Sequence, residues 1–140
     1  MPTTPTTVQA LVYELFNAAL VAAAPAAVIN FPGLDFLVPA DRSYLKVQLL
    51  PNTPFRLTID SDGPMQYQGI YQITVVREQS VGIMGAQEAA GLVALMFPAD
   101  TKLKSGELVV RVMADPAVAM SMPDGADLLT PVSVEYETFF

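Results

Sequence analysis

The hydrophobic pattern changes period at Tyr44, and this change constrains the fold more than any other feature. From Tyr44 onward, apolar and polar residues alternate, as they do in strands that bury one face. The alternating segments are residues 44–50, 55–60, 68–77, 107–113 and 131–138. Before Tyr44, apolar residues instead recur at helical spacing. The pattern therefore predicts a helix followed by a mainly antiparallel sheet.

The predicted first helix runs over residues 8–24. Thr6 is the expected N-cap, with Gln9 at the capping-box spacing, and Pro25 ends the helix. Its apolar arc consists of Val8, Leu11, Val12, Leu15, Ala19 and Ala22. The opposite side is narrow and only partly polar, and it consists of Gln9, Tyr13, Glu14, Asn17, Leu20 and Val21. A helix this apolar is usually covered on both faces, so we expect a neighbouring subunit to cover one of them.

The remaining elements complete an α+β pattern. Residues 44–50 and 55–60 are expected to pair as an antiparallel hairpin around a turn at 51–54, and Gly69 marks a bulge or a close approach in the third strand. A second helix over 84–97 ends at Pro98, and two or three strands follow. The sequence predicts an α+β sandwich in which two main helices pack on an antiparallel or mixed sheet of four to six strands. The expected domain is residues 8–140, after a flexible leader at 1–7.

Composition excludes several functions. The 140 residues include no His, Cys or Trp, so thiol nucleophiles, zinc knuckles and Ser-His-Asp triads are ruled out. Seven Lys and Arg against 14 Asp and Glu, with no cation before Arg42, argue against sequence-specific nucleic-acid binding. The longest apolar run, residues 18–29, is interrupted by Pro25 and is too short to span a membrane.

Two fragments resemble catalytic or binding sites, and each has a simpler interpretation. Residues 60–63 (Asp-Ser-Asp-Gly) could bind a hard cation, but Pro64 and Tyr71 occupy positions where a calcium loop needs ligands, so a β-turn is favoured. Residues 82–85 lack the Lys-Ser/Thr ending of a phosphate loop. We therefore predict no catalytic residue, metal or cofactor. A catalytic pair of carboxylates has no characteristic spacing in a sequence and therefore remains an alternative.

Exposed apolar residues favour assembly over chemistry. The candidate subunit contacts are Tyr13, Leu20, Met120, Met122, Phe139 and Phe140. For Met120, Met122 and the Phe pair, packing within the protomer is an equally weighted alternative. Residues 131–138 alternate cleanly, which predicts a central or inter-subunit strand rather than a frayed tail.

The overall pattern resembles the tail terminator, or tail-completion, proteins of long-tailed bacteriophages, of the lambda type. The resemblance rests on the segment 67–76 (YQGIYQITVV), Gly82 and Gly85, the Ala-rich helix ending at residues 96–98 (MFP), and the strands 108–112 and 131–136 (PVSVEY). It covers about half the chain well. It implies an α/β sandwich protomer that closes into a ring, usually of six subunits.

The resemblance also implies a role and partners. The ring would cap the completed tail tube of a phage or prophage and offer the surface to which the head docks, so its partners would be the tail tube protein and a head-completion protein. The expected location is the virion tail, and the host cytoplasm during assembly. The family supplies no catalytic residues.

Two other hypotheses stay open. A monomeric binding or accessory module would remain monomeric at high concentration. A small carboxylate-dependent hydrolase would place Asp60 and Asp62 in a deep pocket.

Overall fold

The computed structural model describes residues 5–59 and 63–140. It contains helices α1 (Pro5–Ala23) and α2 (Gly82–Ala94), and a short 3-10 helix η1 (Gln79–Val81) that leads into α2. The strands are β1 (Ile29–Asn30), β2 (Tyr44–Pro51), β3 (Phe55–Arg56), β4 (Met65–Glu78), β5 (Lys102–Ser105), β6 (Leu108–Val112), β7 (Ala117–Val118), β8 (Met122–Asp124) and β9 (Asp127–Phe139).

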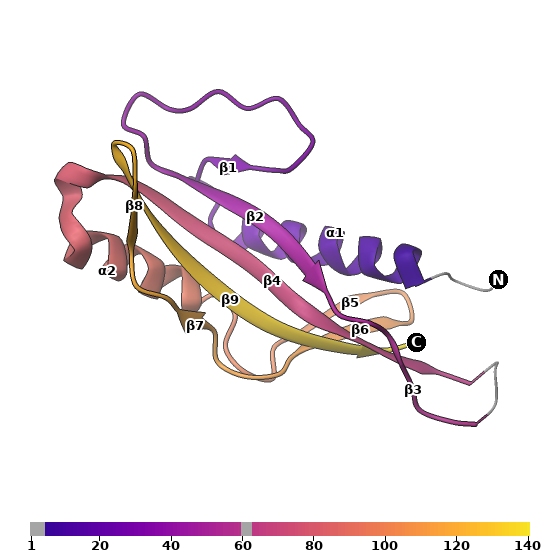
Figure 1. Ribbon diagram of the computed structural model, residues 1–140. Coiled ribbons are helices and arrows are strands. Elements are labelled where there is room, and N and C mark those ends of the chain that lie inside the picture. The colour runs from indigo at the N-terminus through magenta and orange to yellow at the C-terminus, as the bar shows by residue number, and fades with distance from the viewer. Residues whose placement is uncertain (1–4, 60–62) are drawn as a thin grey trace.

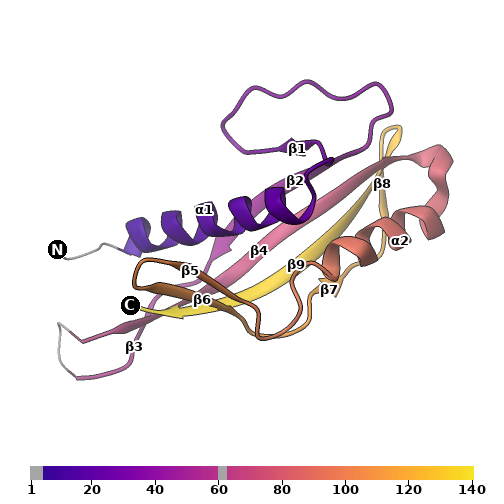
Figure 2. The same ribbon diagram turned by 180° about the vertical axis from the view of Figure 1, so that it is seen from behind.

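The fold is α+β, as predicted. Within the described residues the nine strands form one mixed sheet in the order β1-β2-β4-β9-β6-β5, with only β1 parallel to its neighbour. Both helices lie on the same face of the sheet, which we call the inner face, and leave the outer face without a helix (Figures 1 and 2). Short edge strands raise the strand number above the expected four to six. β5 in particular lies in a segment where no strand was expected.

The C-terminal strand β9 is central, which confirms the prediction. It pairs with β4 along its whole length, from Asp127 opposite Glu78 to Phe139 opposite Gln66. Its other edge carries β8, β7 and β6 in succession. β9 also begins earlier than expected, so Pro131 lies inside it. The Pro131 carbonyl accepts a hydrogen bond from the Ala119 N–H, so the backbone of Pro131 is directed toward the edge that carries β7 and β8. The N–H that proline lacks would point to the same edge, between β7 and β8, where no strand of the described residues pairs with β9.

The expected hairpin between residues 44–50 and 55–60 is wrong, because β2 and β3 run in the same direction along one edge of β4. Pro51 lies opposite Gly69 and Phe55 opposite Gln66, so the three residues between Pro51 and Phe55 face only two residues of β4. This single extra residue is a bulge. It moves Phe55 to the outer face, because a shift of one residue exchanges the two faces of a strand.

Helix α1 turns a different side to the sheet than its apolar arc suggests. Its fully buried residues are Val8, Val12, Phe16 and Leu20. Two polar residues also turn inward because tyrosines of the sheet bind them. The Tyr71 hydroxyl donates a 2.6 Å hydrogen bond to Asn17 Oδ1, and the Tyr136 hydroxyl donates to Gln9 Oε1. Leu20 is therefore a core residue and cannot act as a surface contact.

Both helices also differ from prediction at their ends. α1 begins at Pro5, so Thr6 lies within the helix rather than at its N-cap, and the helix starts inside the expected leader. Pro is favoured in the first turn, where its missing N–H costs nothing. α2 begins at Gly82 and ends at Ala94, before the expected Phe97.

Aromatic rings fill the centre of the core. The Phe16 ring stacks on Tyr71 with their centroids 4.6 Å apart, and contacts Phe97 and Tyr136 at 5.7 and 5.6 Å. Phe97 follows α2 in an irregular segment yet is only 1% exposed. These four residues join α1, β4, β9 and the segment after α2. Burial in this core raises the pKa of the Tyr71 and Tyr136 hydroxyls, so both stay neutral and can donate.

Candidate assembly surfaces

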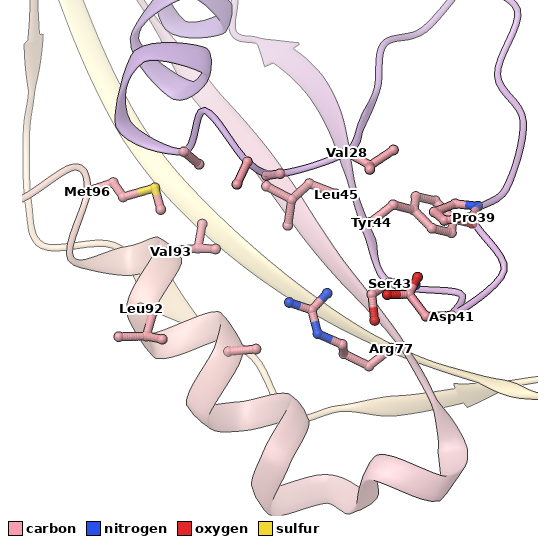
Figure 3. Close-up of a pocket in the computed structure, with 14 residues that line it drawn as sticks. Val28, Pro39, Asp41, Ser43, Tyr44, Leu45, Arg77, Leu92, Val93 and Met96 are labelled. Atoms are coloured by element: carbon pink, nitrogen blue, oxygen red, sulfur yellow. The ribbon is translucent and has the colours of Figure 1, made fainter.

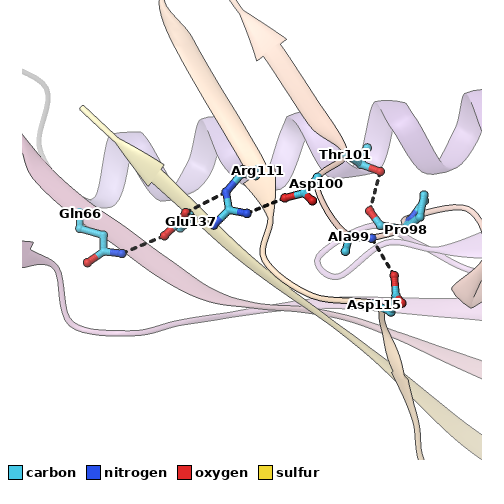
Figure 4. Close-up of polar contacts among 8 residues, drawn as sticks. All are labelled: Gln66, Pro98, Ala99, Asp100, Thr101, Arg111, Asp115 and Glu137. Carbon is cyan, nitrogen blue, oxygen red and sulfur yellow. Dashed lines mark hydrogen bonds and ion pairs between the residues drawn. The ribbon is translucent and has the colours of Figure 1, made fainter.

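Two arginines, Arg42 and Arg111, form structural ion pairs. Glu137 of β9 accepts hydrogen bonds from Arg111 of β6 and from Gln66 Nε2 of β4, the latter 3.0 Å long (Figure 4). Arg111 also donates a 2.7 Å hydrogen bond to Asp100 Oδ1, and the hydrogen bonds that its guanidinium donates, first to Glu137 and then to Asp100, raise the pKa of that guanidinium. The network ties together three strands of the outer face and the segment before β5.

Asp115 adds a second polar tie beside this network. Its Oδ1 accepts a 2.9 Å hydrogen bond from the backbone N–H of Ala99, and the Thr101 hydroxyl donates to the Pro98 carbonyl (Figure 4). These bonds fix the chain between α2 and β5. Within residues 5–59 and 63–140, no three His, Cys, Asp or Glu side chains gather as a metal site. The Asp60 to Asp62 fragment lies outside the described residues.

A pocket of about 440 Å³ lies between the end of α1, the start of β2 and α2 (Figure 3). Its walls are mostly apolar and include Leu45, Val93 and Met96. Arg77 points into it, and its guanidinium donates to the Val76 carbonyl at 2.9 Å. Arg77 has no ion pair within the described part of the chain. The pocket could hold an apolar side chain next to an acceptor or a carboxylate.

The long loop between β1 and β2 exposes apolar side chains. Leu34, Leu37 and Val38 are 68%, 89% and 44% exposed. Arg42 holds the base of this loop, because its Nε and Nη2 donate to the two carboxylate oxygens of Asp127 at 2.7 and 2.8 Å. Those hydrogen bonds lower the pKa of Asp127. A loop of this length that is fixed at its base and apolar at its tip is typical of a binding loop.

Helix α2 also has an apolar outer side. Met84, Leu92 and Leu95 are 74%, 65% and 76% exposed, whereas Ala86, Ala90 and Val93 face the sheet. The hydrophobic pattern of the sequence did not predict this surface or the exposed β1–β2 loop. For α2 the signal was available, because the segment contains only Gln87 and Glu88 as polar residues and is therefore apolar on more than one side.

The hairpin formed by β3 and β4 projects beyond the rest of the sheet (Figure 1). Phe55, Leu57 and Ile59 are 61%, 44% and 97% exposed. Phe55 and Phe139 are both opposite Gln66, one on each side, so the two rings flank it on the outer face. Phe139 and Phe140 are 52% and 40% exposed, and the Phe140 backbone pairs with Met65.

The structure does not bring the expected contact residues together. Tyr13 is half-buried and lines a shallow groove beside β2. Met120 and Met122 are exposed near the start of β9, whereas Phe139 lies at its far end. Met122 pairs with Leu129, ten residues from Phe139, or about 33 Å along the strand. Any contacts made by the methionines and the phenylalanines would therefore involve different parts of a partner.

Comparison with known proteins identifies the family. The model of the phage tail terminator protein family matches residues 7–136. The chain belongs to the phage tail terminator family. Its members are structural tail proteins, so this protein is a structural protein of a phage tail, located in the virion and assembled with other tail proteins.

Solved structures agree with the fold of this tail terminator. One solved structure is 26% identical with a TM-score of 0.71, and the match covers 91% of this chain and 96% of the other. A chain from the virion of a native gene transfer agent particle is 16% identical with a TM-score of 0.54, and the match covers 94% of each chain. No curated protein matches the sequence. In the described residues, no helix is long and apolar enough to cross a membrane.

Proposed function

We propose that this tail terminator closes into a ring, of six subunits as the family resemblance implies, that caps the completed tail tube and presents the surface to which the head docks. The proposal depends chiefly on the family match, which spans nearly the whole domain. The exposed apolar surfaces support it: the β1–β2 loop, the outer side of α2, and the β3–β4 hairpin with Phe139. Exposed apolar patches of this kind mark protein–protein interaction sites.

The partners follow from this role. The two faces of such a ring differ, because a ring of identical subunits arranged head to tail has no axis that exchanges its faces. One face would bind the tail tube protein and the other a head-completion protein. Assembly would take place in the host cytoplasm, and the protein would then remain in the virion tail.

Electron microscopy tests the proposal. Tails assembled without the protein should lack a terminal ring and fail to join heads, and adding the purified protein should restore both. The same preparation with an unrelated acidic protein of similar size is the control. Tails that reach their normal length and join heads without the protein would refute the proposal.

The pocket at Arg77 favours one alternative, a monomeric binding module, because its 440 Å³ could hold a small ligand. Sedimentation at high concentration separates the two functions. A strict monomer, both alone and on isolated tails, would favour the binding module.

A further inference from the structure

We propose that neighbouring subunits of the ring contact each other through the β3–β4 hairpin of one copy, which lies along the groove between α1 and the open edge of β2 in the next copy. This inference rests on the proposed ring function and names the surfaces that would close the ring. The two surfaces differ and belong to separate parts of the protomer. Contacts of this head-to-tail type generate closed rings when the rotation between subunits closes.

The first surface is the groove, which has a volume of about 400 Å³. Its lining is mainly apolar and consists of Gln9, Ala10, Tyr13, Pro32, Gln48, Leu49 and Pro51. An extended segment could lie in it with one or two apolar side chains pointing toward α1. The helix and the strand edge would then both contribute to binding.

β1 pairs only with Leu45 and Lys46 of β2. Among the described residues, the rest of this edge of β2, from Val47 onward, has no strand partner. The Leu45 N–H donates to the Val28 carbonyl, so the odd-numbered residues of β2 direct their backbone groups toward this edge. Leu49 is therefore in position to pair with an added strand. Adding a strand to an open edge is a common mode of peptide recognition.

Gln9 provides a second, independent indication. It is only 9% exposed, and its Oε1 accepts the Tyr136 hydroxyl, but its Nε2 has no acceptor in the part of the chain that the structure describes. A buried amide donor without a partner is destabilising. A backbone carbonyl from the neighbouring copy, arriving through the groove, could supply the acceptor after a small shift of the side chain.

The second surface is the hairpin. The bulge between β2 and β3 places Phe55 on the outer face, and Leu57 and Ile59, in the irregular segment that follows β3, are 44% and 97% exposed. The outer edge of β3 has no strand partner among the described residues. An exposed apolar edge strand is normally protected or paired with another chain. The hairpin therefore offers three exposed apolar side chains, one on the short strand β3 and two in the segment that follows it, which the groove can accept.

The size of the contact explains why a ring, rather than a dimer, would be the stable form. The three hairpin side chains expose on the order of 300 Å² of apolar area, given about 150–250 Å² for a large side chain. A specific interface needs about 800 Å² from each partner. One hairpin contact is therefore weak, and copies should associate stably only where each makes two contacts and a tail tip holds them together.

Cysteine cross-linking tests the placement, since the sequence contains no cysteine. Ala10→Cys places a thiol in the groove and Ile59→Cys one on the hairpin. Under mild oxidation on tails, a mixture of the two variants should give a disulfide dimer containing one copy of each. The double variant, with both cysteines in one chain, should give a ladder of cross-linked oligomers, and the largest of them should contain as many copies as the ring. Val81→Cys mixed with Ala10→Cys is the control, because Val81 is 47% exposed but lies in η1, outside the proposed contact.

Charged substitutions provide the functional test. Ile59→Asp should lower ring formation on tails at least tenfold, whereas Val81→Asp should leave it unchanged, because Val81 is 47% exposed in η1 and belongs to none of the proposed assembly surfaces. Ala10→Arg should act like Ile59→Asp, with Ala18→Arg, also exposed on α1, as its control. Thermal melting of each variant verifies that the protomer is folded.

The outcomes separate this inference from the proposed function. Rings that form without the mixed cross-link would overturn the hairpin contact and leave the ring function standing. If Ile59→Asp forms normal rings that fail to bind tails, the hairpin binds another tail protein and the inference is wrong. Absence of any ring on tails would count against the proposed function itself.

Discussion

Gly69 of β4 lies so close to Tyr136 of β9 that a Cβ atom on Gly69 would be 2.8 Å from the Tyr136 hydroxyl. The same Cβ would be 2.5 Å from the Leu50 carbonyl oxygen and 2.9 Å from the Pro51 Cα. Two of these three neighbours are backbone atoms and cannot move aside easily. The close approach suggested by the sequence is therefore real, and it occurs where the chain leaves β2 for the bulge.

We expect Gly69→Ala to lower the free energy of unfolding by about 1–3 kcal/mol, the usual cost of overpacking. Urea denaturation measures this. Gly91→Ala is the matched control: Gly91 lies inside α2 and nothing in the described structure comes within 4 Å of an added Cβ. It should stabilise the protein by about 0.5–1 kcal/mol, because Ala is favoured over Gly in a helix. Equal effects of the two substitutions would contradict the close approach.

Tyr71→Phe should cost about 1 kcal/mol, because it removes the hydrogen bond to Asn17 while keeping the stacked ring against Phe16. A double-mutant cycle with Asn17→Ala isolates the bond from other effects. Phe16→Ala should cost about 3–5 kcal/mol, because it empties the centre of the aromatic core. A coupling energy of zero between residues 71 and 17 would show that the bond does not stabilise the protein.

The Arg42 to Asp127 ion pair should make stability depend on acid pH. Arg42 lowers the pKa of Asp127 in the folded protein, so the pair stabilises the fold above the unfolded pKa of Asp, about 3.9. This contribution is lost as the pH falls through the lower, folded pKa. Melting temperatures of the wild type and Asp127→Asn should therefore differ at pH 7 and converge in strong acid. A difference that is the same at pH 7 and pH 2 would contradict this linkage.

Phe139 and Phe140 should matter more for assembly than for the stability of the protomer. Both rings are about half exposed, so changing them to Ser should cost about 1 kcal/mol or less. Tail completion should nevertheless fail if the rings dock on a neighbour. Phe97→Ala, which empties a buried site, should cost about 3–5 kcal/mol. If the double Ser variant completes tails normally, neither ring is a contact.

The protein should not bind DNA tightly. Among residues 5–59 and 63–140, the cations outside the three ion pairs are Lys46, Arg56, Arg77, Lys102 and Lys104, and they are spread over both edges and the centre of the sheet. If a ring forms, we expect its channel to be neutral or acidic, which lets DNA pass without sticking. Gel shifts at low and moderate salt should show no retained duplex. Tight, salt-sensitive binding would contradict this expectation.

The hydrophobic period predicted the α+β fold, and the strands over 44–50, 68–77, 107–113 and 131–138, because each has one buried face. The hydrophobic period did not predict how residues 44–50 and 55–60 pair, because a single extra residue determines that pairing. The extra residue between Pro51 and Phe55 leaves the alternation of both strands intact, so no local pattern distinguishes a bulge from a turn. The inward positions of Gln9 and Asn17 depend on tyrosines more than 50 residues away. No periodicity within α1 could reveal those partners.

The candidate contact residues were predicted less well, for a related reason. The helical pattern places Leu20 on the surface, because its apolar arc lies on the other side of the helix. The alternation of residues 55–60 predicts that Ile59 lies in a strand within the sheet, yet Ile59 is the most exposed large apolar residue of the described chain. Whether an apolar residue is buried depends on what the rest of the chain places next to it.

The central position of β9 also determines when the protomer can fold. β4 is synthesised about 60 residues before its main partner, and β6, β7 and β8 find their common neighbour only when β9 arrives. Contacts between segments so far apart in sequence slow folding. An incomplete nascent chain would therefore lack the sheet that supports both helices and the hairpin. Surfaces suited to assembly would become available only on chains whose synthesis has reached β9, which protects a growing tail from truncated subunits.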